Sequence, residues 1–142
     1  MFKTTMLAVA LTTTLAGPAY AQQCLHGPTE TAEESARRRD ALTATRTINN
    51  LQANQPGAIN RVYLRHADLA GSPFAVTMRD ARSAVVKRIS LDPEQDILPG
   101  WRLTLDVTER GYWFMIRDTT DPCGFAFVSN QTGLIFTAEP IR

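Results

Sequence analysis

Residues 101–137 read WRLTLDVTERGYWFMIRDTTDPCGFAFVSNQTGLIFT, and this stretch decides the fold class. Apolar and polar residues alternate over 103–108, which is the two-residue period of a strand with one buried face. Residues 109–111 can turn the chain, and the aromatic segment 112–116 favours a second strand that pairs back antiparallel. The first half of the stretch therefore predicts a β-hairpin.

The second half of this stretch repeats the pattern at shorter length. We expect a loop at 118–122, a third strand at 125–128, a turn at 129–133 and a fourth strand at 134–137. Because each connection is short, consecutive strands should lie next to one another. The sequence therefore predicts an antiparallel β-meander at the C-terminal end of the chain.

A helix is expected before the sheet, over residues 28–55. Thr29 or Thr31 can cap its start, and the proline–glycine pair after Gln55 ends it. Its apolar face is narrow and rich in alanine, which suits close packing on a flat sheet. That face comprises Ala41, Ala44, Ile48 and Leu51, with Leu42 beside it. The fold class is therefore predicted as α+β, with one N-terminal helix packed on a C-terminal antiparallel β-meander.

Residues 58–98 carry conflicting signals. Residues 62–64 suit a short strand or a turn, apolar residues alternate over 74–78 as in a strand, and β-branched residues over 85–89 favour another. The same region also fits helical spacing, and the serine–proline pair at 72–73 would begin a helix well. The β-branched residues favour strand followed by strand, with the helical alternative left open.

The first residues, MFKTTMLAVALTTTLAGPAYA, have the layout of a secretory signal peptide. One cation, Lys3, precedes an apolar run at 6–16, and small residues surround the expected cleavage site after Ala21. A membrane-spanning helix needs roughly 20 apolar residues, so the run is too short for an anchor. We expect residues 1–21 to be a cleavable signal peptide and 22–142 to form a single domain, periplasmic or secreted.

The charge balance argues against a nucleic-acid partner. The chain has 15 Lys and Arg against 14 Asp and Glu, so loss of Lys3 with the signal would bring the formal net charge to zero. Polyanion binding needs an excess of Lys and Arg on one face. The arginine run at 37–39 is interpreted as a solvated helix face, with a docking patch as the alternative. No second apolar run of spanning length follows, so no membrane span is expected after signal removal.

The chain has two cysteines, Cys24 and Cys123. In an exported protein, two cysteines are most simply a disulfide pair. A bond between them would close a loop of about 100 residues, which the loop-entropy account associates with roughly 4–5 kcal/mol of stabilisation. The bond would tie the N-terminal segment to the C-terminal sheet. A reactive cysteine is the weaker interpretation, because neither cysteine has an activating partner nearby in sequence.

The two histidines give a weak signal for catalysis. His66 lies two residues from Asp68, and a carboxylate can orient a histidine that acts as general base. That spacing is common, and no nucleophile motif accompanies it. A histidine in a surface loop is the simpler interpretation of His66. His26, between Cys24 and Gly27, is interpreted as structural or incidental.

Asp118 and Asp121 are the best acidic pair in the sequence. With loop carbonyls they could hold Ca²⁺, which takes six to eight oxygen ligands. The alternative is turn chemistry, because aspartate caps its own backbone in turns and Asp-Pro initiates them. The composition of 118–122 favours a turn, so we expect no metal site, no cofactor and no catalytic residue in this chain.

Three segments resemble one protein family. They are DALTATRTINNLQ at 40–52, GYWF at 111–114 and GFAFVSNQTGLIF at 124–136. The first resembles the helix that follows the membrane segment in type IV pilins and type II secretion pseudopilins. The other two are similar to the last strands of those proteins. The chain departs from the family at its start, where it lacks the prepilin peptidase motif and the long apolar helix of the filament core.

The resemblance implies a soluble, pilin-like headpiece that cannot polymerise through the usual core. We therefore expect an exported, non-enzymatic structural or binding module whose partner is another protein at the cell envelope. One alternative is a small periplasmic enzyme that uses His66 and Asp68, or the acidic loop that carries Asp118 and Asp121. The other is a secreted inhibitor or receptor-like binding protein, which predicts an exposed apolar patch around Trp101 and Trp113.

Overall fold

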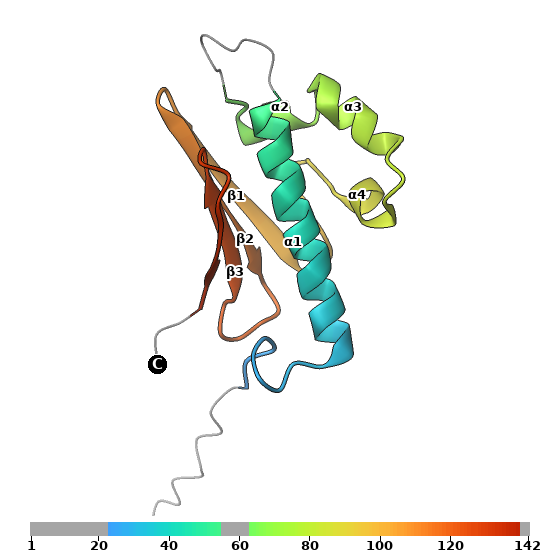
Figure 1. The fold of residues 1–142 in the computed structure, drawn as a ribbon, viewed down its shortest axis with the longest axis vertical. Helices are drawn as coiled ribbons and strands as arrows, with labels where there is room; N and C mark the ends of the chain where they lie inside the picture. The colour runs from blue at the N-terminus through green and yellow to red at the C-terminus, as the bar shows by residue number, and fades with distance from the viewer. Residues whose placement is uncertain (1–22, 55–62, 140–142) are drawn as a thin grey trace, which may run out of the picture.

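The computed structural model describes residues 23–54 and 63–139, which form two layers (Figure 1). The helix α1 lies across one face of a four-stranded sheet, and the short helices α3 and α4 lie beside α1, away from the C-terminal strand. The helices are α1 Ala32–Ala53, α2 His66–Leu69, α3 Pro73–Arg79 and α4 Ala84–Arg88; the strands are β1 Trp101–Thr108, β2 Gly111–Asp118, β3 Ala126–Asn130 and β4 Ile135–Ala138. The α+β fold with a C-terminal meander is as predicted.

The helix α1 begins with a capping box. The Thr31 hydroxyl accepts from the Glu34 backbone N–H, and the Glu34 carboxylate accepts from the Thr31 N–H. These two bonds satisfy N–H groups that a helix start otherwise leaves open. Thr31, rather than Thr29, is therefore the cap, and the helix begins later than predicted. Its predicted end at Gln55 lies outside the described residues.

The apolar face of α1 packs on the sheet. The four residues of the predicted stripe have no solvent exposure, and Leu42 packs beside them. They meet side chains that alternate along the inner face of the sheet, namely Trp101, Leu103, Tyr112, Phe114, Ile116 and Phe127. The small alanines let the helix backbone approach the aromatic residues closely. The helix α1 thereby covers part of the core, and buried residues of α2 and α3, Leu69 and Met78, complete it.

The sheet has the order β1-β2-β3-β4, and every neighbouring pair is antiparallel. The turn between β1 and β2 lies at Glu109 and Arg110, as predicted. β3 extends two residues further than expected, because Ser129 pairs with Phe114 and Asn130 pairs with Trp113. The last turn is correspondingly shorter.

The prediction of strands within 58–98 is wrong for the residues that the structure describes there. Residues 73–79 and 84–88 are helices. Ser72 caps α3 by accepting from the Ala75 N–H, and Ser83 caps α4 by accepting from the Val86 N–H. These local caps outweigh the strand preference of β-branched side chains.

Other sequence predictions fall outside the described residues. The signal peptide at 1–21, its cleavage after Ala21 and the start of the domain at residue 22 are among them, as is Val62. Tyr63 and Leu64 precede α2 without joining a strand. Within the described ranges, no helix has both the length and the apolar character needed to cross a bilayer.

Candidate functional site

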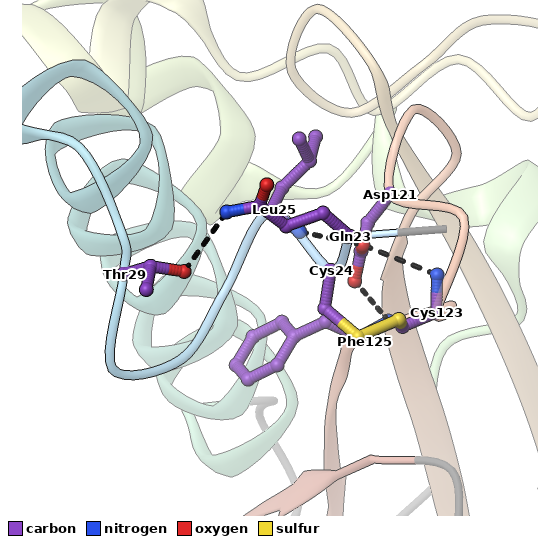
Figure 2. The surroundings of a disulfide bond; sticks show 7 residues. All are labelled: Gln23, Cys24, Leu25, Thr29, Asp121, Cys123 and Phe125. Carbon is purple, nitrogen blue, oxygen red and sulfur yellow. Dashed lines mark hydrogen bonds between the residues drawn. A yellow bond between two sulfur atoms is a disulfide. The ribbon is translucent and has the colours of Figure 1, made fainter. Parts of the chain in front are cut away.

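The predicted disulfide is present, between Cys24 and Cys123 (Figure 2). The two Cα atoms are 5.2 Å apart, although the residues are 99 positions apart in the sequence. Cys24 lies in the segment before α1, and Cys123 lies in the loop between β2 and β3. The bond therefore joins the N-terminal segment to the sheet.

Asp121 reinforces this connection from the same loop. Its Oδ1 accepts from the Leu25 N–H at 3.0 Å and the Cys123 N–H at 3.1 Å, and its Oδ2 accepts from the Phe125 N–H at 3.0 Å. Burial alone would raise the pKa of Asp121, but these three N–H donors outweigh burial and lower it. Asp121 shapes its own loop, as the turn interpretation predicted, and it also binds the N-terminal segment (Figure 2).

His26 lies at the centre of the cluster, with its side chain almost fully buried. Its Nδ1 is 2.8 Å from Glu30 Oε1, and its Nε2 is 2.9 Å from Asp118 Oδ2. The imidazole also packs against Phe125, with ring centroids 4.6 Å apart. Because an ionised carboxylate only accepts, the ring donates both bonds when each nitrogen carries a proton. His26 is therefore structural, and it connects the segment before α1 to β2.

Asp118 is the most enclosed carboxylate of the cluster, with a fully buried side chain. Its Oδ1 accepts from the backbone N–H and hydroxyl of Thr120 at 2.8 and 2.7 Å, and from Arg37 Nη2 at 3.3 Å. Burial would raise the pKa of Asp118, but the bonds from Thr120 and His26, with the charge of Arg37, lower it below its ordinary value. Each carboxylate oxygen of Asp118 thus has at least one hydrogen-bond donor beside it.

Glu30 and Arg38 close the outer side of the cluster. Arg38 Nε donates to Glu30 Oε1 at 2.8 Å, and Arg38 Nη2 donates to Glu30 Oε2 at 2.7 Å. This two-pronged pair, assisted by His26 and opposed by burial, lowers the pKa of Glu30 to about 2. The interpretation of residues 37–39 as a solvated face is therefore wrong for Arg37 and Arg38, which are half-buried and ion-paired; Arg39 is exposed.

We call this cluster the N-terminal clamp. It comprises Cys24, His26, Glu30, Arg37, Arg38, Asp118, Asp121 and Cys123. Sequence reasoning identified the cysteines and singled out the aspartates, but did not connect either aspartate to His26 or to the arginines. The disulfide was the one signal that could have done so, because it brings residues near 24 next to residues near 123.

A second polar cluster lies near the other end of α1. The Tyr112 hydroxyl donates to Asn49 Oδ1 at 3.1 Å, and Asn49 Nδ2 lies 2.9 Å from Ser129 Oγ. The Ser129 hydroxyl in turn lies 2.7 Å from the Leu134 carbonyl oxygen, to which it can donate. The side chains of this Asn49 cluster are neutral and buried, and they connect α1 to β2, β3 and the last hairpin. No pattern in the sequence predicts it.

The acidic pair is not arranged for calcium. Asp118 and Asp121 have their oxygens turned to N–H, O–H and guanidinium donors, which a cation would have to displace. Within the described part of the chain, no group of three or more His, Cys, Asp or Glu residues is positioned to hold a metal ion. The loop therefore has the character of a structural turn.

The pair proposed for catalysis, His66 and Asp68, is not assembled into a site. His66 begins α2 and is half-buried, and burial lowers its pKa. Among the described residues, no hydrogen bond joins His66 to Asp68, and neither residue meets the N-terminal clamp. The contact by which Asp68 would orient His66 as a general base is thus not formed.

The two tryptophans have opposite environments. Trp101 is 1% exposed and packs against Phe127 and Phe125 inside the core. Trp113 is 43% exposed on the outer face of the sheet, and its indole N–H donates to Asp106 Oδ2 at 3.2 Å. An exposed patch around both rings was predicted by the binder alternative, and only Trp113 can contribute to one.

Comparison with protein-family models, curated proteins and solved structures finds no match for this chain. Function must therefore be argued from the contacts of its own residues. Those contacts describe a site in which charged groups hold the chain together, and an outer sheet face on which apolar side chains remain exposed.

Proposed function

We propose that this chain is a non-enzymatic structural or binding module that works outside the cytoplasm, in the periplasm or as a secreted protein. One observation carries the proposal: the acidic and imidazole groups of the N-terminal clamp are occupied by internal contacts. His26 and Asp118 bond to each other, Asp118 also bonds to Arg37, and Asp121 bonds to backbone N–H groups. A catalytic acid or base must reach a proton of its substrate, and these groups face the interior.

Export is supported by the two features that meet at the N-terminus. The sequence of residues 1–21 is typical of a signal peptide. The Cys24–Cys123 bond lies directly after it, and disulfides persist in oxidising compartments.

The pilin-like headpiece remains our proposal for the kind of module. A helix followed by an antiparallel meander is the arrangement that the family resemblance implies, and the resembling segments fall on α1, β2 and the β3–β4 hairpin. Such a headpiece would act by contact with another protein at the cell envelope. The exposed outer face of the sheet offers a surface for that contact.

Two measurements on one preparation test this proposal. The chain is expressed in a bacterial host with its native N-terminus, cell fractions are separated, and the intact mass is measured with and without reduction and alkylation. We expect the protein in the periplasm or medium, with a mass of residues 22–142 minus two hydrogens and no free thiol. A cytoplasmic, full-length protein with two alkylatable cysteines would contradict it.

A further inference from the structure

The last strand, β4, is an edge of the sheet. It pairs with β3 on one side. Within residues 23–54 and 63–139, no strand pairs with its other side. An edge strand presents a row of N–H and C=O groups that can pair with another chain.

The register identifies which backbone groups of β4 face outward. The Asp118 N–H donates to the Phe125 carbonyl, and the Gln131 N–H donates to the Tyr112 carbonyl. Odd-numbered residues of β3 therefore turn their backbone groups to β2, and even-numbered residues turn theirs to β4. The β4 residues that pair with those even-numbered residues form their backbone hydrogen bonds to β3. Ile135 and Thr137 therefore direct their N–H and C=O groups away from β3, toward the open edge.

The side chains of β4 do not protect this edge. Natural edges are commonly guarded by charged residues, proline or a bulge, whereas β4 reads IFTA and carries no charge. Phe136 is 55% exposed on the outer face of the sheet, and Leu134, just before β4, is 60% exposed. The edge therefore combines open hydrogen-bonding groups with exposed apolar side chains.

We propose that β4 pairs antiparallel with β4 of a second copy of this chain, about a two-fold axis that passes beside Phe136. In this register Ile135 lies opposite Thr137 of the second copy, and Thr137 lies opposite its Ile135. Each such pair exchanges two backbone hydrogen bonds, so all the outward groups of both strands are used. Phe136 then faces its own counterpart in the closely spaced pair of the ladder.

A second copy is the occupant that this edge fits best. A two-fold contact requires a self-complementary surface, and the uncharged β4 places no like charges against each other. On the outer face, Leu134 would lie beside Ala138 of the second copy, next to the paired phenylalanines. The helix α1 packs over β3 rather than beyond β4, so it leaves the edge accessible (Figure 1).

The size of the contact sets its expected strength. A four-residue strand and two apolar side chains bury far less than the roughly 800 Å² per partner of a stable interface. The dimer is therefore expected to exchange and to depend on protein concentration. This inference concerns assembly, and it stands whether or not the chain is exported as proposed above.

Cysteine cross-linking tests the register. Phe136→Cys places two thiols opposite each other across the two-fold axis, so the purified, oxidised protein should form a disulfide-linked dimer while Cys24–Cys123 stays intact. Trp113→Cys is the matched control: it replaces another exposed aromatic residue of the same face, two strands away from the edge. Equal cross-linking of the two variants would overturn the proposed pairing.

Sedimentation of the unmodified protein tests the assembly itself. The average mass should rise toward a dimer between about 10 μM and about 1 mM, the range of weak affinities. Phe136→Asp should abolish that rise with an unchanged circular-dichroism spectrum, and Trp113→Asp should retain it. A monomer at all concentrations, or a dimer that Phe136→Asp leaves intact, would overturn the inference. If the edge binds only to another protein, the purified chain would stay monomeric at all concentrations.

Discussion

Two polar clusters hold α1 on the sheet, and their chemistry differs. The N-terminal clamp uses charged side chains and a disulfide, whereas the Asn49 cluster uses a neutral amide and hydroxyl groups. The segment at 23–31 has little apolar surface of its own, because Leu25 is its only large aliphatic residue. It therefore depends on charge and covalent bonding. The Asn49 cluster lies among core residues that already hold its elements together, and it adds specificity to them.

The disulfide should show the largest effect in this comparison. In the double variant Cys24→Ser with Cys123→Ser, the unfolded chain regains the freedom of a loop of about 100 residues, which should lower the free energy of unfolding by about 4 kcal/mol. Denaturant unfolding followed by circular dichroism measures this loss. Reduction of the unsubstituted protein is the control and should give a similar value. A loss below about 1 kcal/mol would mean that the N-terminal segment is held without the bond.

Asp118→Asn should rank second. It keeps the size of the side chain but removes the charge that faces His26 and Arg37, and breaking a buried ion pair on one side costs about 3 kcal/mol. Thermal and denaturant unfolding at pH 7 would measure the change. Asp106→Asn is the matched control, since Asp106 lies exposed on the outer face and bonds to Trp113. If both variants lost the same small free energy of unfolding, the contacts of Asp118 in the clamp would stabilise the fold no more than those of an exposed aspartate.

Tyr112→Phe should have the smallest effect. It removes the hydroxyl that donates to Asn49 while keeping the buried ring, so a loss of about 1 kcal/mol is expected. Because neither partner carries a charge near neutral pH, that loss should be the same at pH 7 and pH 4. Unfolding curves at both pH values provide the measurement. A loss of stability that changed with pH would contradict the distinction between a charged N-terminal clamp and a neutral Asn49 cluster.

The fold was largely predictable because its determinants are local. Alternation and short turns set the meander, and the spacing of small apolar residues sets the buried face of α1. The strand prediction for residues 73–88 was wrong because two local signals disagreed there. The β-branched side chains favour strands, but the caps supplied by Ser72 and Ser83 start helices, and no pattern in that region gave their relative weight.

The clamp was only partly predictable because its contacts join distant parts of the chain. Asp121 was correctly interpreted as a turn residue, since two of its bonds stay within its own loop. Asp118 bonds to His26 and Arg37, which lie 92 and 81 positions away. Local composition carries no information about such a pairing. Only the predicted Cys24–Cys123 bond implied that these segments meet.

The acid dependence of stability tests the central claim, that the carboxylates of the clamp are structural anchors. Glu30, Asp118 and Asp121 have lowered pKa values in the folded chain. Their stabilisation is therefore complete above the ordinary values of 4.5 for Glu and 3.8 for Asp, and is lost as the pH falls toward the lowered values, about 2 for Glu30.

We would measure the free energy of unfolding of the oxidised protein from about pH 7 to about pH 2, beside Asp118→Asn. We predict a fall in the free energy of unfolding below about pH 5 that is shallower in the variant, because one anchor is already absent. The lowered pKa of His66 adds a decline from about pH 7 downward that should be the same in both proteins. A free energy that stayed level below about pH 5, or that fell equally in both proteins there, would contradict the central claim.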